Sequence, residues 1–175
     1  MSPQSPQSVR SILILGDAGV GKSTFINALK GRQFTESYVS TIGKDLFTYT
    51  YGDTTLHLHD MPGQSRWSNI CHEYYQYAQG AIIMYDMSDS NETVERWKKE
   101  LSEYDIPILV VGNKCDTEMY IPNGADIYIS CKTGENVDQV IPAIEPLLKP
   151  IVLPETWLPD SLWMWIASQT PCCLQ

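Results

Sequence analysis

The segment Gly16–Ser23, GDAGVGKS, narrows the possible folds of this chain to a small set, because it has the spacing G-x-x-x-x-G-K-S. It follows the apolar run Val9–Leu15 and leads into Lys22–Lys30, where apolar residues recur at helical spacing. Glycines at such positions let successive backbone N–H groups point at phosphate oxygens, and the following helix adds the positive end of its dipole. The segment therefore predicts a buried strand, a phosphate-binding loop and a helix capped by Gly31.

Further strands are predicted where apolar residues run together or alternate, at Leu46–Tyr51, Thr54–Asp60, Gly80–Asp86, Ile106–Gly112 and Asp126–Ser130. The first two of these pair as an antiparallel hairpin through a Gly-Asp turn. Helical patterns lie at 73–78, 92–104 and 137–148, and two prolines should kink or shorten the last. This order predicts an α/β fold with a six-stranded, mostly parallel sheet, one antiparallel edge strand and helices on both faces.

Composition divides the chain into three parts. Residues 1–8 contain mostly Ser, Pro and Gln, and we expect a disordered extension there. Residues 9–149 carry the whole alternating pattern and should form one domain. Residues 150–175 contain four prolines and no Lys or Arg, so we expect a variable C-terminal tail outside the domain.

Charge and cysteine content exclude several classes of function. There are 12 Lys and Arg residues against 21 Asp and Glu residues, which gives a net charge of -9. The chain therefore lacks the cationic surplus that a general nucleic-acid binder needs. Its five cysteines form no CxxC pair, and its histidines complete no zinc spacing. We expect reduced thiols in a cytoplasmic protein.

The phosphate loop assigns roles to two side chains. Lys22 should reach the β- and γ-phosphates of a nucleotide, and the Ser23 hydroxyl should bind Mg²⁺. A glycine-rich turn that matches by chance is the competing interpretation, and the strand before it and the helix after it argue against this. The loop alone does not distinguish ATP from GTP.

A second segment, DMPGQ, ends the third predicted strand. Its Asp60 stands where a carboxylate holds Mg²⁺, often through water. Gly63 can offer an N–H group to the γ-phosphate, and Gln64 can orient the attacking water. Thr41, in STIG, can add another Mg²⁺ ligand.

A third segment, NKCD, follows the strand that ends at Gly112 and points to guanine. The Asp116 carboxylate can accept the N1–H and 2-amino protons of guanine, a donor pair that adenine lacks. The Lys114 stem can lie along the base, and Asn113 can tie this loop to the phosphate loop. The backbone N–H groups of Ser130–Lys132 can meet the guanine O6. An ordinary turn after a buried strand is the alternative.

Taken in order, GDAGVGKS, ESYVSTIGKD, HDMPGQSRW, EYYQYAQGAIIMYD, VGNKCD and SCKTGENVD resemble the motifs of Ras-superfamily small GTPases, and STIGKD and the Tyr-Tyr pair resemble the Rab family. The resemblance implies a P-loop fold and a switch that binds GTP or GDP with Mg²⁺, hydrolyses GTP slowly and regulates membrane trafficking. It implies effectors, an exchange factor, a GTPase-activating protein and the cytosolic face of a membrane as partners. It also places Thr41 in switch I, Gln64 in switch II, and the Phe34 ring across the guanine. An ordinary core or surface Phe is the alternative for Phe34.

The complete expected site has three sets of residues. Residues expected to contact the nucleotide are Asp17, Ala18, Gly19, Val20, Gly21, Lys22, Ser23, Thr24, Phe34, Thr41, Gly63, Asn113, Lys114, Asp116, Ser130, Cys131 and Lys132. The expected catalytic residues are Lys22, Thr41 and Gln64, and the expected Mg²⁺ ligands are Ser23, Thr41 and Asp60.

The chain departs from the family pattern at Met61-Pro62, where Rab proteins usually have Thr-Ala. Proline fixes φ and lacks an N–H, so it can stiffen the segment that carries Gln64. The alternative function is therefore a GTP-locked or hydrolysis-poor module that sequesters Rab partners. An ATP-using kinase is disfavoured by NKCD and by the few arginines. The stretch from Asn113 to Ser130 is shorter than Rab proteins usually have. We therefore expect the fourth helix of the family fold to be replaced by a turn around Ile121–Gly124.

The chain ends in PCCLQ, and Cys172 and Cys173 are candidate lipidation sites. The sequence resembles both a C-a-a-X motif and Rab endings that receive two geranylgeranyl groups. One lipid needs a second membrane signal, and this tail has no basic patch. Trp157, Trp163 and Trp165 can supply that signal at the membrane interface, or they can pack back on the domain.

Overall fold

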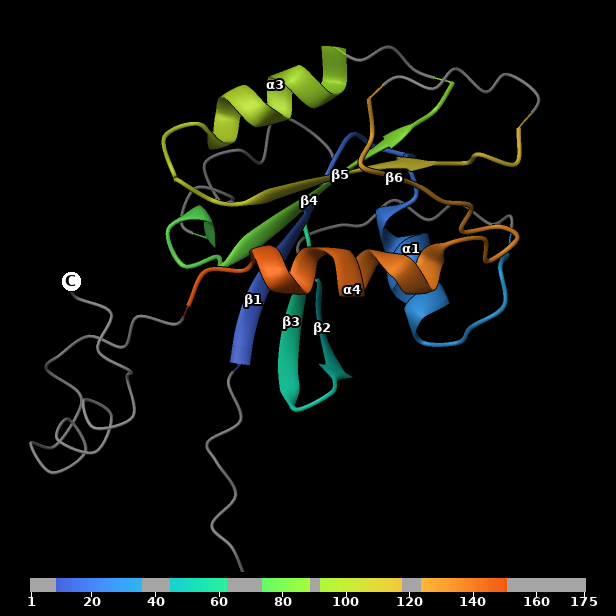
Figure 1. The fold of residues 1–175 in the computed structure, drawn as a ribbon. Coiled ribbons are helices and arrows are strands. Elements are labelled where there is room, and N and C mark those ends of the chain that lie inside the picture. The colour runs from blue at the N-terminus through green and yellow to red at the C-terminus, as the bar shows by residue number, and fades with distance from the viewer. Residues whose placement is uncertain (1–8, 36–44, 63–73, 89–91, 118–123, 151–175) are drawn as a thin grey trace, which may run out of the picture.

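A central sheet organises the computed structural model, which describes residues 9–35, 45–62, 74–88, 92–117 and 124–150 (Figure 1). Its six strands within these residues are β1 (Val9–Leu15), β2 (Asp45–Tyr51), β3 (Thr54–Asp60), β4 (Gly80–Asp86), β5 (Ile108–Asn113) and β6 (Ile127–Tyr128). The strand order is β2-β3-β1-β4-β5-β6, and only the β2–β3 pair is antiparallel. The predicted fold class is confirmed.

The strand order reverses at β1. This strand pairs with β3 on one side and β4 on the other, so the chain leaves it at the point where the order reverses. Ligands of open α/β sheets bind at such a point, beyond the carboxyl ends of the strands. The loop from Gly16 to Gly21 follows β1 at this position.

Helices cover both faces of the sheet (Figure 1). Helix α1 (Lys22–Leu29) and helix α4 (Val140–Ile144) lie on one face, and α3 (Glu92–Leu101) lies on the other. Short 3₁₀ segments, η2 (Val137–Gln139) and η3 (Glu145–Leu147), flank α4.

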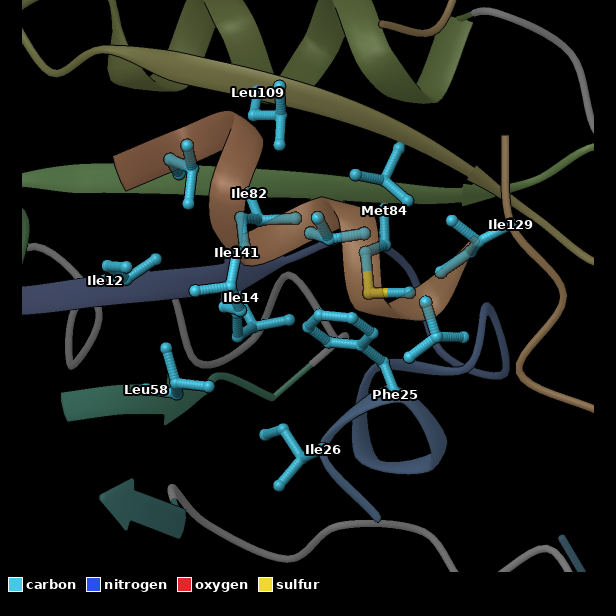
Figure 2. Packing of buried hydrophobic residues seen from close by; sticks show 14 of the residues in the cluster. Ile12, Ile14, Phe25, Ile26, Leu58, Ile82, Met84, Leu109, Ile129 and Ile141 are labelled. Atoms are coloured by element: carbon cyan, nitrogen blue, oxygen red, sulfur yellow. The ribbon is translucent and has the colours of Figure 1, made fainter. Parts of the chain in front are cut away.

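Two apolar cores follow from this arrangement. Successive residues of a strand point to opposite faces. Ile12 and Ile14 of β1 therefore lie in the core under α1 and α4, and Leu13 and Leu15 lie in the core under α3. Figure 2 shows Phe25 of α1 pointing toward Ile14 and Met84 in the first core. Burial on both faces explains why the central strands read as continuous apolar runs.

Several element bounds differ from those predicted. Helix α1 ends at Leu29, and Gly31, with φ 68, closes it as expected. The N–H of Gly31 bonds the carbonyl of Ala28 at 2.9 Å, and that of Arg32 bonds the carbonyl of Asn27 at 3.0 Å. This pairing is a Schellman motif, which satisfies the last carbonyls of the helix.

The predicted helix at 137–148 is broken into η2, α4 and η3, as its prolines indicated. Pro142 stands in the first turn of α4, where its missing N–H removes no bond of that helix. Pro146 stands in η3. An inward stripe, which includes Ile141 and Leu148, still packs in the core.

Three other predicted segments are too long. The helix at 92–104 ends at Leu101, and the strand at 126–130 is only β6. In the segment predicted as a helix over 73–78, helical backbone ends at Tyr75 and a turn follows. The turn predicted around Ile121–Gly124 lies outside the described residues except for Gly124.

Candidate nucleotide-binding site

At two positions, the loop after β1 lies so close to neighbouring strands that only glycine fits there. Gly16 has φ 139, and a Cβ atom there would lie 2.1 Å from the carbonyl oxygen of Met84. Gly21 has φ 102, and a Cβ atom there would lie 2.2 Å from Asn113 Nδ2. The loop is therefore pressed against the ends of β4 and β5, with its exposed part at Ala18 and Gly19.

Lys22 is folded back over this loop. Its side chain is buried, and Nζ donates hydrogen bonds of 2.8 Å to the carbonyl oxygens of Gly16 and Asp17. Burial lowers the pKa of Lys22, while the carboxylates of Asp60 and Asp17 act in the opposite direction. Helix α1 has no acidic residue in its first turn and no side-chain cap. Positive charge thus gathers where an anion can bind.

Ser23 and Asp60 meet beside Lys22. The register pairs Ile14 of β1 with Asp60, so the ends of β1 and β3 are adjacent. Ser23 Oγ donates to Asp60 Oδ2 at 2.5 Å, and Asp60 is buried. A hydroxyl and a carboxylate are ligands that Mg²⁺ accepts when phosphates and water complete its shell, so these residues fit the ion. Within the described residues no group of three or more His, Cys, Asp or Glu side chains could hold a metal.

Asn113 joins the phosphate loop to the base-recognition segments. This side chain is only 2% exposed. Its Nδ2 donates to the carbonyl oxygen of Val20 at 2.8 Å, and its Oδ1 accepts from the backbone N–H of Cys131 at 3.1 Å. The structure therefore has the predicted tie between NKCD and the phosphate loop. The Cys131 N–H, which we expected to meet a base oxygen, bonds Asn113 here.

The Asp116 carboxylate is held by the segment that follows β6. Ser130 Oγ donates to Asp116 Oδ1 at 2.6 Å and accepts from the Thr133 N–H at 3.1 Å. Asp116 is exposed, so its carboxylate is accessible to a ligand. Lys132, the third residue of the SCK segment, is exposed as well.

Lys114 is held by a residue that sequence reasoning missed. Its backbone has φ 67, and its Nζ pairs with Asp86 Oδ2 at 2.5 Å, at the end of β4. Asp86 also accepts from the Ser88 N–H at 3.0 Å and hydroxyl at 2.7 Å. The parallel pairing of β4 with β5 could have revealed Asp86 as the partner of Lys114, because this register places Asp86 beside Asn113, the neighbour of Lys114.

The remaining expected residues divide into two groups. Thr24 lies half-buried in α1, and Phe34 is 40% exposed beyond that helix, so it is a surface residue here. Residues that lie outside the described part of the chain are Thr41, Gly63, Gln64, Cys172 and Cys173.

Together, the glycine loop, the buried lysine and the hydroxyl–carboxylate pair define a P-loop nucleotide-binding protein. The model of the Ras family matches residues 11–141. The Ras-related protein Rab-1C of Dictyostelium discoideum is 35% identical over 147 residues, which cover 79% of this chain and 71% of that protein. The GTP-binding protein ypt1 of Schizosaccharomyces pombe is 40% identical over 114 residues, which cover 60% of this chain and 56% of that protein.

The Ras-related protein SEC4 of Candida albicans is 31% identical over 161 residues, which cover 79% of this chain and 77% of that protein. The chain therefore belongs to the Ras family, as a Rab-type small GTPase. Members of this family hydrolyse GTP, and the predicted enzyme class is confirmed.

Substituting Asp86→Asn should weaken the domain in a pH-dependent way. Burial alone would raise the pKa of Asp86, but the hydrogen bonds from Lys114 and Ser88 outweigh it and hold the pKa below its ordinary value. The charged form therefore stabilises the fold above about pH 4, and this contribution is lost as the pH falls through the lowered pKa.

Near neutral pH we expect the variant to lose about 0.5–1 kcal/mol in the free energy of unfolding, the usual size for a partly exposed ion pair. Urea denaturation between pH 3 and 7 measures the difference, which should shrink at the acid end. Asp53→Asn, in the exposed turn between β2 and β3, is the matched control. A difference that stays constant down to pH 3 would contradict the assignment.

Proposed function

We propose that this protein is a guanine-nucleotide-dependent switch in membrane trafficking that binds GTP or GDP with Mg²⁺ and hydrolyses GTP slowly. The observation that carries the proposal is the pair of hydrogen bonds of Asn113, because they hold the phosphate loop and the SCK segment against the NKCD loop. One ligand with a base at one end and phosphates at the other would contact all three segments.

On the phosphate side, Lys22 and the N–H groups of the loop bind phosphate oxygens. Ser23 and Asp60, completed by Thr41, hold Mg²⁺, which neutralises charge on the phosphates when it is bound. Gln64 orients the attacking water. The burial of Lys22 supports its role at the phosphates. The short Ser23–Asp60 contact supports the role of these two residues as Mg²⁺ ligands.

On the base side, Asp116 selects guanine by accepting its N1–H and 2-amino protons. The Ser130 hydroxyl supports this role, because its hydrogen bond to Oδ1 restrains the carboxylate. The Lys114 stem lies along the base, with its ammonium group held by Asp86. Phe34 covers the other side of the base.

Asp116→Asn should move nucleotide preference from GTP toward xanthosine triphosphate. The amide can donate to the 2-oxo group of xanthine, while the charge-assisted bonds to guanine are lost, so GTP affinity should fall about 10- to 100-fold. Competition binding with fluorescent nucleotides measures both affinities. Asp138→Asn, an exposed carboxyl in η2, is the control and should leave them unchanged. Unchanged GTP affinity in the Asp116 variant would overturn the base assignment.

The hydrolysis step is where the alternative function remains open. Met61 and Pro62 are buried, and the Met61 N–H bonds the carbonyl of Ile14 at 3.2 Å. The chain is therefore anchored immediately before the segment that carries Gln64, with a proline that fixes φ. This anchoring favours slow hydrolysis. If hydrolysis is absent altogether, the protein is a GTP-locked binding module that sequesters partners of other Rab proteins.

Gln64→Leu should slow GTP cleavage by about tenfold, a loss of ~1.4 kcal/mol in transition-state stabilisation, because the attacking water loses its orienting amide. Single-turnover assays with the loaded full-length protein measure the rate. Pro62→Ala in the same assay shows whether the proline limits the wild-type rate. Equal, negligible rates for wild type and Gln64→Leu would refute the enzyme mechanism and favour the binding module.

Membrane attachment forms the last part of the proposal. No helix among the described residues is long and apolar enough to cross a membrane. We infer attachment through Cys172 and Cys173, with effectors, an exchange factor and a GTPase-activating protein as partners. The attachment is inferred from the PCCLQ ending, and the partners are inferred from the Rab-type relatives.

The terminal cysteines should carry prenyl groups when the full chain is produced in eukaryotic cells. Intact-mass spectrometry should show one or two added groups, and membrane fractionation should recover the protein with membranes. The double variant Cys172→Ser/Cys173→Ser should lose both properties, while Cys115→Ser, which removes a half-buried free cysteine after β5, should keep the modification. An unmodified wild-type mass would contradict the lipid anchor.

A further inference from the structure

The side chain of Asp17 connects the phosphate loop to the opposite helical layer. Asp17 is the second residue of the loop, and its carboxylate accepts from three side chains of α3. Thr93 Oγ1 donates to Oδ2 at 3.1 Å, and Trp97 Nε1 donates to Oδ1 at 3.3 Å. The Arg96 guanidinium forms an ion pair with the same Oδ1. One face of α3, over little more than one turn, therefore supplies all these donors.

Helix α3 is a firm support for these contacts. Trp97 is 5% exposed and packs in the core beneath α3 together with Val94 and Leu101. Arg96 differs from Trp97 because 58% of its side chain is exposed. The cluster thus combines a buried anchor with a charged group that solvent can reach.

A carboxylate in this position conflicts with the chemistry of the loop. The loop binds an anion, and a neighbouring negative charge opposes that binding. The backbone oxygen of Asp17 also accepts from Lys22 Nζ at 2.8 Å, so any shift of Asp17 moves an anchor of the lysine that binds phosphate. The ion pair with Arg96 reduces the repulsion, because it neutralises the carboxylate. It also restrains the position of Asp17.

We propose that Arg96 is a positioning residue for the nucleotide site, and that its ion pair with Asp17 slows the dissociation of the bound guanine nucleotide. The proposal rests on the proposed function, since it concerns the same nucleotide. It goes further by assigning α3, which supplies no residue to the expected site, a part in nucleotide retention. GTP carries more negative charge than GDP, so loss of the ion pair should affect GTP more.

Dissociation rates of fluorescent GDP and GTP analogues, measured on the full chain with excess Mg²⁺ and unlabelled nucleotide, test the proposal. Arg96→Gln should accelerate release about two- to fivefold, the scale of an exposed ion pair, with the larger change for GTP. Arg96→Lys keeps the charge and should restore much of the wild-type rate. Lys98→Gln removes an equal charge from the same helix, where Lys98 pairs with Glu95 at 3.1 Å, and should change neither rate.

The double variant separates a specific contact from a general charge effect. In an Asp17→Asn background, Arg96→Gln should produce no further acceleration, because the charge that it neutralises is gone. Thr93→Val provides a second route, since it removes the hydrogen bond to the other carboxylate oxygen and should also speed release. If Arg96→Gln matches wild type, or if its effect persists with Asp17→Asn, the proposal is wrong. If the wild-type chain retains no guanine nucleotide, the proposed function fails instead.

Discussion

The site depends on one buried amide. Asn113 lies at the end of β5 with its side chain 2% exposed, and it satisfies the Val20 carbonyl with one end and the Cys131 N–H with the other. A buried amide in a low-dielectric interior costs free energy unless each polar group is paired, so these bonds specify the relative positions of three loops. The same amide requires glycine at position 21, because any Cβ atom on Gly21 would collide with it.

Electrostatics explains how an acidic chain can bind an anion. The net charge is -9, yet Lys22 is buried within the loop and the first turn of α1 carries no acidic residue. Two of the carboxylates at the expected ligand-binding loops are paired with cations, Asp17 with Arg96 and Asp86 with Lys114. The local field is therefore set by a few arranged groups rather than by the overall charge.

Much of this arrangement could be predicted because it is encoded in short segments. The bounds of β1, β3 and β4 match the predicted runs, and Gly31 ends α1 in the left-handed conformation. The hydrogen bond between Asn113 and the phosphate loop was also predicted, since the carboxyl ends of parallel strands lie at one edge of the sheet. The shortening of β6 could not be predicted, because its length depends on which residues of β5 it meets.

The contacts between distant segments show why the rest escaped prediction. Asp17 and Arg96 are 79 positions apart, and no spacing rule joins a loop after β1 to the exposed side of α3. Such a pair can be recognised only in the folded chain, because the sheet determines which side of the loop faces α3. Local chemistry thus determines what the loop can bind, while packing between layers determines how firmly the loop is held. The second property, which governs how long a nucleotide stays, is a consequence of the tertiary fold.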